Sequence, residues 1–142
     1  MPNSTLMIRL EPRIDAVPGM LDRLEAYAEE TDVPPKTAYR LAVVCEELAA
    51  NVAMHGAGGE GGATYVEIKV RRDGEARLRL SVEDDGRPFD PLTQAPPDIS
   101  LDLDDREIGG LGIHFVRSLV QEIAYERQDR RNCLTAIFDM VE

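Results

Sequence analysis

The stretch from Arg40 to Gly56 constrains the fold more than any other part of this chain, because two patterns overlap in it. Aliphatic residues recur in it at spacings of three and four, at Leu41, Val44, Leu48 and Val52. That spacing is typical of one stripe of an amphipathic helix packed against another layer. A polar row repeats every four residues beside it, at Glu47, Asn51 and His55. A carboxylate, an amide and an imidazole in one row of an otherwise apolar helix indicate that this helix lines a pocket.

The remaining periodicities predict further elements on both sides of this helix. Helical spacing predicts helices over 18–30, from Pro34 or Pro35 to about His55, and over 113–120. Alternation predicts strands over 5–11, 65–71, 77–83, 122–128 and 133–141. Asp73-Gly74 is typical of a hairpin turn, and 129–132 is expected to join the last two strands.

The resulting order is β-α-α-β-β-lid-α-β-β, in which strands and helices do not alternate strictly. We therefore predict the class α+β: a two-layer α/β sandwich with a mixed, mostly antiparallel sheet and helices on one face. A length of 142 residues suits a single domain over 1–142. The proline-rich, acidic segment at about 90–112 is longer than an ordinary connection, so we expect it to be a mobile lid.

The charge balance excludes some classes of partner. Acidic residues outnumber basic ones by 27 to 16, which gives a formal net charge of −11. Such a chain does not suit broad binding to nucleic acid or to an anionic membrane, because both need cationic side chains. No apolar run has the length of a membrane span and the N-terminus does not have the pattern of a signal peptide, so we expect a cytoplasmic protein.

Two common phosphate-binding motifs do not explain the pocket. Gly56, Gly58 and Gly61 spell G-x-G-x-x-G, but a dinucleotide-binding motif follows a strand and opens a helix. This run follows a predicted helix and opens a predicted strand, so we interpret it as a flexible connection. The pattern G-x-x-x-x-G-K-[ST] does not occur in the sequence.

Three other groups of residues point to a chemical site when they are taken together. Asn51 offers an amide oxygen suited to Mg²⁺, and Glu47 offers a carboxylate that can act as a general base. Strand alternation places Asp84 on the apolar side of its strand, where a carboxylate can accept a hydrogen bond from an exocyclic amine. The glycines within 109–112 open a helix, where backbone N–H groups can approach an anion. Each group alone has an ordinary explanation as a solvated pair, an acidic turn or a hinge, but the three seldom occur in this order by chance.

These segments resemble the motifs of the GHKL ATPase/kinase superfamily, which has the Bergerat fold. The run Glu47-x-x-x-Asn51-x-x-x-His55-Gly56 resembles its N box. The run Asp84-Asp85-Gly86-Arg87-Pro88-Phe89-Asp90-Pro91 resembles the Pro-Phe-Asp variant of its D-x-G box. The run Gly110-Leu111-Gly112-Ile113 resembles its second glycine box. That variant and the short length are most similar to the anti-sigma factor serine-protein kinases of bacterial partner-switching systems.

The resemblance implies a histidine kinase-like ATPase fold that binds ATP and Mg²⁺. It implies that Asn51 holds the Mg²⁺ ion and that Glu47 is the catalytic general base. It also implies that Asp84 accepts the adenine amino group and that Gly86 lets the base come close.

The same resemblance adds four residues to the expected nucleotide site. Gly110 and Gly112 would let the lid wrap around the phosphates. His55 would support the site from the end of its helix. Thr135 is a weaker candidate, because the run 131–135 stands where the superfamily often has Gly-Thr.

The function implied by the resemblance is that of a protein-serine kinase and anti-sigma factor. It would bind a sigma factor, phosphorylate an anti-sigma-factor antagonist and so regulate transcription, and it would form a homodimer without direct contact to nucleic acid or membrane. Two alternatives remain open from the sequence. One is a non-catalytic module that captures a sigma factor or another regulator in a nucleotide-dependent way, and the other is a structural relative that has lost nucleotide binding.

Overall fold

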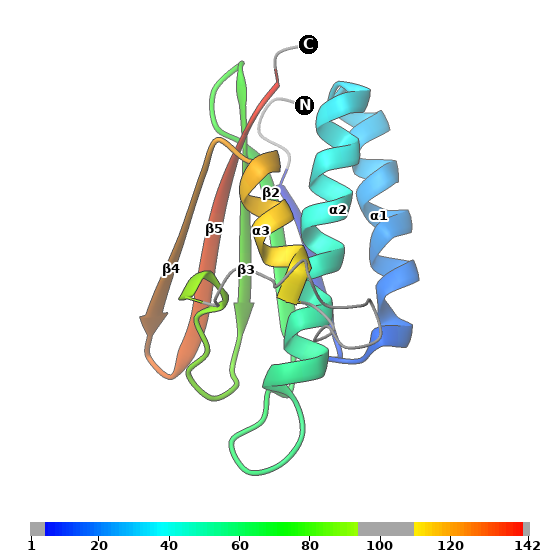
Figure 1. Ribbon diagram of the computed structural model, residues 1–142. Helices are drawn as coiled ribbons and strands as arrows, with labels where there is room; N and C mark the ends of the chain where they lie inside the picture. The colour runs from blue at the N-terminus through cyan, green and yellow to red at the C-terminus, as the bar shows by residue number, and fades with distance from the viewer. Residues whose placement is uncertain (1–4, 94–109, 141–142) are drawn as a thin grey trace.

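The computed structural model describes residues 5–93 and 110–140, which contain five strands and three α-helices (Figure 1). The strands are β1 (Thr5–Leu10), β2 (Val66–Arg72), β3 (Arg77–Asp84), β4 (Glu122–Gln128) and β5 (Arg131–Asp139). The helices are α1 (Val17–Glu30), α2 (Pro35–Asn51) and α3 (Gly110–Leu119). Short 3₁₀ turns lie at Ile14–Ala16 and Pro91–Thr93, and a π-helical turn at Val52–Gly56 continues α2. The predicted order of elements is confirmed, and most of the predicted lid, residues 94–109, lies outside the described residues.

The described strands form one sheet in the order β1-β2-β3-β5-β4, and the helices cover one of its faces (Figure 1). The chain reverses its direction at α1, at α2 and again at β2, so β2 returns antiparallel to β1. Hairpins join β2 to β3 and β4 to β5, and β5 fills the place between β3 and β4. The two-layer α+β fold with a mostly antiparallel sheet is therefore confirmed, and every described strand pair is antiparallel, so the sheet is not mixed over the described residues.

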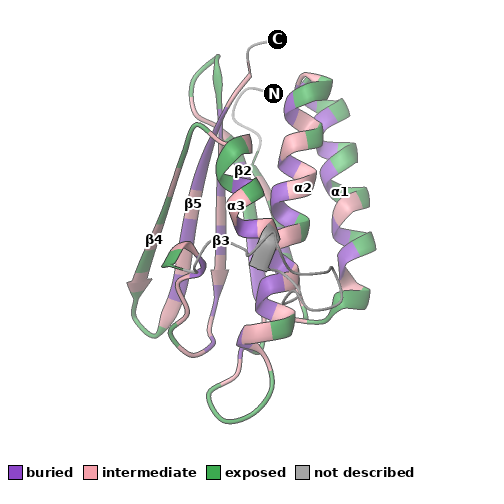
Figure 2. Cartoon of the chain, in the orientation of Figure 1, coloured by how far each residue is buried: buried purple, intermediate pink, exposed green. Residues whose placement is uncertain are grey.

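The apolar core lies between the sheet and the helices (Figure 2). Alternate residues of the central strands are buried in it: Val66, Ile68, Val70, Leu78, Leu80, Val82, Leu134, Ala136 and Phe138. The predicted stripe of α2 packs on these residues, since Leu41, Val44, Leu48 and Val52 are all buried. The aliphatic spacing in the sequence thus identified the face that α2 turns toward the sheet.

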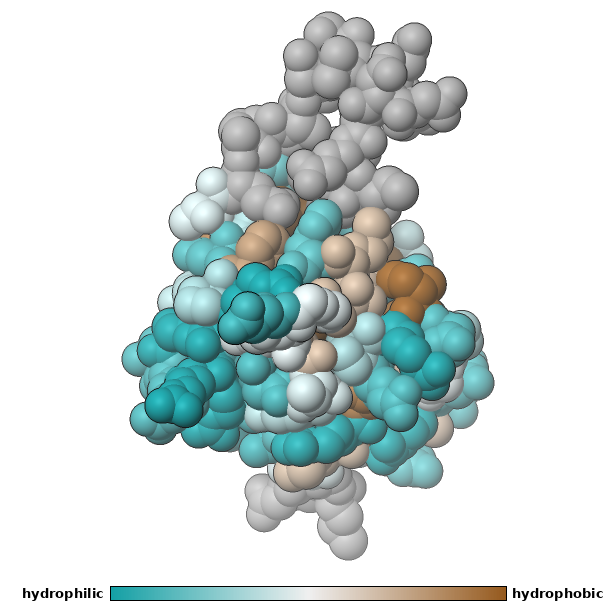
Figure 3. Space-filling model, turned by 90° about the horizontal axis from the view of Figure 1, so that it is seen from below, coloured by the Kyte–Doolittle hydropathy of each residue, from teal (hydrophilic) through white to brown (hydrophobic). Residues whose placement is uncertain are grey.

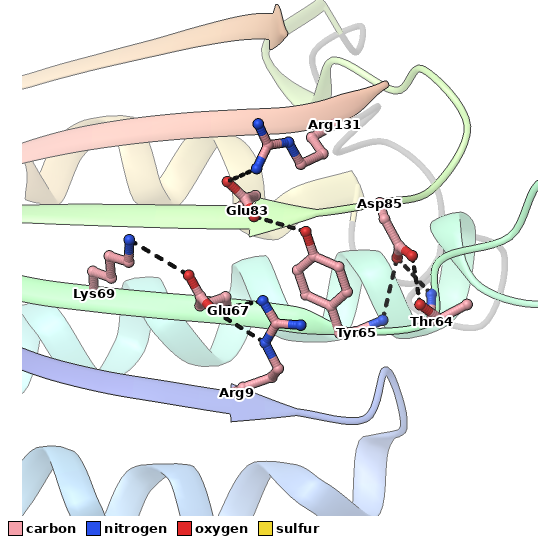
Figure 4. Close-up of polar contacts among 8 residues, drawn as sticks. All are labelled: Arg9, Thr64, Tyr65, Glu67, Lys69, Glu83, Asp85 and Arg131. Carbon is pink, nitrogen blue, oxygen red and sulfur yellow. Dashed lines mark hydrogen bonds and ion pairs between the residues drawn. The ribbon is translucent and has the colours of Figure 1, made fainter. Parts of the chain in front are cut away.

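The opposite face of the sheet is lined by polar and charged side chains from several strands (Figure 4). Arg9 on β1 donates hydrogen bonds to Glu67 on β2 from Nε at 3.0 Å and from Nη2 at 2.8 Å, and its guanidinium lies over the ring of Tyr65. The Tyr65 hydroxyl donates to Glu83 at 2.7 Å, and Arg131 donates to the same carboxylate at 3.4 Å. These charged residues lie on the face away from the helices, so the strand register is fixed with the apolar residues toward the core.

Hydrophilic residues cover most of the described surface in the view from below the molecule (Figure 3). Hydrophobic residues show there only as small patches, as expected for a chain of which 30% is charged. None of the helices within residues 5–93 and 110–140 combines the length and the apolar character needed to cross a bilayer.

Candidate functional site

A narrow pocket lies between α2, the sheet and the segment that follows β3. Its walls include Leu48, Asn51, Asp84, Phe89, Tyr125 and Asn132. Its volume is about 30 Å³, which is room for roughly one water molecule. The pocket brings Asn51 of α2 and the Asp84 carboxylate at the end of β3 together.

Asn51 is a buried polar residue whose side chain is not used by the fold. The residue is 2% exposed, and within the described part of the chain neither Oδ1 nor Nδ2 has a hydrogen-bond partner. An unpaired buried amide costs about 1–3 kcal/mol, so native proteins rarely keep one. The π-helical turn at Val52–Gly56 follows directly, and such turns are frequent at functional sites. Asn51 therefore offers an acceptor and a donor to a ligand in the pocket.

Glu47 lies one helical turn before Asn51 and is half-buried. Loss of hydration on burial raises the pKa of its carboxyl group, and the neighbouring Glu46 carboxylate raises it further. A carboxylate with a raised pKa is a stronger proton acceptor than a solvated one, which suits a general base. The start of α3 lies against it, because a Cβ at Gly112 would overlap Glu47 Oε2. The structure thus brings Glu47 and Gly112 together, while Gly110 is the first residue of α3.

Replacing Gly112 with Ala is expected to lower the free energy of unfolding by about 1 kcal/mol or less, because the added methyl group displaces only the flexible end of the Glu47 side chain. The matched control is Gly19→Ala in α1, where a Cβ meets no atom within 4 Å and where Ala is the better helix former by up to about 1 kcal/mol. Urea unfolding measures both variants. A Glu47→Ala substitution should restore most of the loss caused by Gly112→Ala. Equal effects of the two glycine substitutions would contradict the close contact.

Asp84 ends β3 and faces the pocket. It is 7% exposed, and its Oδ1 accepts hydrogen bonds from the Gly86 N–H and from Asn132 Nδ2, both at 2.9 Å. Burial raises the pKa of the Asp84 carboxyl group, and the hydrogen bonds from Asn132 and Gly86 offset that effect only in part. Asp84 is therefore a buried acid held in place by two donors to the same oxygen.

Asp85, the next residue in the chain, is not among the residues that line the pocket, and its carboxylate is directed toward Thr64 (Figure 4). Its carboxylate accepts hydrogen bonds from the Thr64 N–H at 2.6 Å and from the Tyr65 N–H at 3.3 Å, and also from the Thr64 hydroxyl. Burial acts to raise the pKa of Asp85, but these hydrogen bonds outweigh it and the pKa is lowered. Asp85 thus holds the segment before β2 to the end of β3. The alternation along β3 correctly predicted that Asp84, and not Asp85, faces the pocket.

Gly86 is enclosed by the protein's own backbone. A Cβ there would lie 2.9 Å from the Gly56 carbonyl oxygen and 3.0 Å from the Ala63 nitrogen. Arg127 Nη1 donates a hydrogen bond to the Gly86 carbonyl at 2.7 Å. Close packing of the connection between α2 and β2 therefore requires glycine at this position, and the expected approach of a base to Gly86 stays a prediction.

Asn132 is a pocket residue that is not among the site residues expected from the sequence. It lies opposite Asp84 in the register of β3 and β5 and is 6% exposed. Thr135, which was selected instead, lies on the other face of β5, with Ser81 and Ala124 as its cross-strand neighbours. The structure therefore brings Asn132 to Asp84 and places Thr135 away from the pocket, because strand residues three apart point to opposite faces.

His55 lies beside the pocket, in the π-helical turn. Its ring stacks on Phe89 with ring centroids 5.9 Å apart. Arg87 donates from Nη1 to the His55 carbonyl at 3.0 Å and from Nη2 to the Gly58 carbonyl. Arg87 thus holds the glycine-rich segment to the loop after β3, and that segment connects a helix to a strand, as predicted.

This two-layer fold, with its pocket between α2 and the sheet, is the architecture of histidine kinase-like ATPase domains. The sequence model of that family matches residues 10–138, and the chain belongs to the family. The superfamily inferred from the motifs is therefore confirmed.

Three known proteins illustrate the relationship. The serine/threonine-protein kinase BtrW of Bordetella bronchiseptica is 26% identical over 98 residues, which are 68% of this chain and 67% of BtrW. The structure of the RsbU and RsbW domains of Rv1364c from Mycobacterium tuberculosis has a TM-score of 0.68 at 16% identity, and covers 99% of this chain and 36% of that chain. The SiaB–SiaC complex from Pseudomonas aeruginosa has a TM-score of 0.62 at 15% identity, and covers 94% of this chain and 88% of that chain. The chain thus corresponds to little more than a third of the mycobacterial chain, and the two structures establish likeness of fold alone.

Proposed function

We propose that this chain binds ATP with Mg²⁺ in the pocket and transfers the γ-phosphoryl group to a serine of an anti-sigma-factor antagonist. The observation that carries the proposal is the buried Asn51 amide, which has no partner among the described residues and lies one turn after Glu47. Membership of a kinase-like ATPase family supports the proposal, and so does the similarity to BtrW, which is named as a serine/threonine-protein kinase.

The residues present fit a magnesium-bound nucleotide. Mg²⁺ takes oxygen ligands, keeps several waters and is usually held by one or two protein groups together with substrate phosphates. Asn51 Oδ1 is such an oxygen, and it is buried and has no hydrogen-bond partner among the described residues. When bound, Mg²⁺ neutralises charge on the phosphates during transfer. Asn51 is the residue that would hold it.

Glu47 supplies the general base in this proposal. Its half-buried carboxylate with a raised pKa accepts the proton of the serine hydroxyl as that oxygen attacks the γ-phosphorus. The remaining requirement of phosphoryl transfer is positioning and charge stabilisation. Gly112, in the first turn of α3, lies next to Glu47, and a helix N-terminus favours the negative charge of phosphates.

Asp84 supplies recognition of the base. Its buried carboxylate accepts a hydrogen bond from the adenine amino group, and a charge-assisted bond of this kind contributes about 1.5–3 kcal/mol. The side chains of Leu48 and Phe89 provide apolar walls for the ring. His55 supports Phe89 by stacking on it.

The proposed activity is that of a partner-switching regulator of transcription. The chain binds a sigma factor and so acts as an anti-sigma factor. The unphosphorylated antagonist releases the sigma factor from the chain, and phosphorylation of the antagonist prevents that release. SiaB is seen in a complex with SiaC, which supports a protein partner for this chain also. A single domain over 1–142 with a lid at about 90–112, a homodimer and a cytoplasmic location remain predictions.

The proposal is tested by incubating the chain with ATP labelled at the γ-phosphate, Mg²⁺ and the antagonist protein. Label is expected on a serine of the antagonist, in an acid-stable linkage, and it should be absent when that serine is replaced by Ala. An acid-labile label on histidine would contradict the serine assignment. Nucleotide-dependent capture of a sigma factor without transfer would overturn the kinase and favour a non-catalytic binding module.

A further inference from the structure

Asn132 is the centre of a hydrogen-bond network that joins three segments of the chain. It lies near the start of β5, opposite Asp84 of β3 and Arg127 of β4. Its Nδ2 donates to Asp84 Oδ1 and to the Arg87 carbonyl, both at 2.9 Å. Its Oδ1 accepts from the Phe89 N–H at 3.2 Å, the Tyr125 hydroxyl at 2.5 Å and Arg127 Nη1 at 3.2 Å. The whole amide is therefore committed to partners inside the protein.

These partners fix which way the amide points. The Phe89 N–H and the Arg127 guanidinium can only donate, so the atom that faces them must be the carbonyl oxygen. The NH₂ group must then face Asp84 and the Arg87 carbonyl, which are acceptors. Asn132 consequently presents a donor to Asp84 and cannot turn around to present an acceptor.

This arrangement determines which oxygen of Asp84 can accept a hydrogen bond from a ligand. Both of its hydrogen bonds, from Gly86 N and from Asn132 Nδ2, go to Oδ1. Oδ2 is thus the oxygen that remains to accept a hydrogen bond from a ligand. The hydrogen bond from Asn132 is also the strongest influence opposing the burial that raises the pKa of Asp84, so it favours the ionised, accepting form.

We infer that Asn132 is a positioning residue that holds Asp84 as a hydrogen-bond acceptor and so sets the preference of the site for a 6-amino purine over a 6-oxo purine. The inference rests on the proposed nucleotide site and goes beyond it, because it assigns the choice between adenine and hypoxanthine to a residue that does not touch the base. An ionised Asp84 accepts from the adenine amino group and repels the 6-oxo group of hypoxanthine. An Asp84 released from Asn132 rotates or takes up a proton, and it then tolerates the 6-oxo group.

The test compares dissociation constants for ATP and ITP, each with Mg²⁺, in the wild type and in three variants. The wild type is expected to prefer ATP by at least about a hundredfold, as sites built to bond a polar group reject analogues that do not supply it. Asn132→Ala should reduce the preference to below about tenfold. Thr135→Ala, on the other face of the same strand, should leave it unchanged. A merely structural role of Asn132 would weaken ATP and ITP binding equally and leave the ratio as in the wild type.

A second variant protects the test against loss of folding. Asn132→Asp has the same shape and still accepts from Phe89, Tyr125 and Arg127, but it places a second carboxyl group against Asp84, so the two groups share a proton and Asp84 no longer stays fully ionised. It should also lose the preference for ATP. If either variant keeps its thermal unfolding midpoint and retains the wild-type ratio, the inference is overturned. If the wild type binds neither ATP nor ITP, the proposed function itself is wrong. If the wild type binds both nucleotides equally well, the role assigned to Asp84 and Asn132 is wrong.

Discussion

Replacing Glu47 with Gln is expected to slow phosphoryl transfer by about 10²–10⁴-fold while nucleotide affinity stays close to that of the wild type. The substitution keeps the shape of the side chain and its place against Gly112, but an amide cannot take the proton of the attacking hydroxyl. Single-turnover transfer rates and nucleotide titration separate the two effects. The exposed neighbour Glu46 is the matched control, because Glu46→Gln removes the same charge one residue away and should leave transfer intact.

The role of Glu47 as a base also predicts how the rate of phosphoryl transfer depends on pH. Burial raises the pKa of Glu47, and the base works only when it is deprotonated. Transfer should therefore fall as the pH is lowered through a pKa above the ordinary Glu value of about 4.3, and this limb of the profile should vanish in Glu47→Gln. A Glu47→Gln variant with the rate and pH profile of the wild type would remove Glu47 from the chemistry.

Asn51→Leu is expected to raise the free energy of unfolding by about 1–3 kcal/mol without nucleotide, while Mg²⁺-dependent nucleotide binding is lost. The reason is that the buried Asn51 amide has no partner among the described residues, so an apolar side chain of similar size removes the cost of desolvation. Urea unfolding of the ligand-free protein and a nucleotide titration measure the two effects. Few substitutions are expected to stabilise a fold and abolish its function together.

Asn132→Leu is the matched control, because this second buried asparagine has every polar atom engaged. Its removal takes one hydrogen bond from Asp84 and one from Arg127 inside a buried network, so the free energy of unfolding should fall by about 1–3 kcal/mol. Equal destabilisation by the two substitutions would mean that the Asn51 amide is already satisfied in the free protein. The argument that it is kept for a ligand would then fail.

The sequence predicted the elements whose periodicity is strong. The stripe of α2 and the alternation of β2 and β3 gave the layers and the side of the pocket on which Asp84 lies. The end of α2 could not be predicted from the sequence, because the π-helical turn at Val52–Gly56 changes the backbone hydrogen bonding without changing the spacing of the residues. The close contacts of Gly86 with the backbone depend on a connection far away in the sequence, so a motif alone could not show them.

The omission of Asn132 has a specific cause. Asp129 and Arg130 form the turn between β4 and β5 with φ angles of 47° and 65°, which non-glycine residues seldom adopt. A longer turn at 129–132 was therefore predicted, and Asn132 was placed in it, although β5 begins at Arg131. The alternation of Leu134, Ala136 and Phe138 extends back to Asn132 and excludes Thr135 from the pocket face. This alternation is the sequence feature that indicates Asn132, rather than Thr135, as the pocket residue of β5.

The pocket lined by Asn51 and Asp84 is proposed to be a nucleotide site. Calorimetric titration with ATP, in the presence and absence of Mg²⁺, tests it most directly. We expect saturable binding of one nucleotide per chain, tighter with Mg²⁺ than without it, and weaker by about tenfold or more in Asp84→Ala, since a charge-assisted hydrogen bond to the base is lost. An absence of saturable binding, or equal affinity in the wild type and Asp84→Ala, would contradict the account.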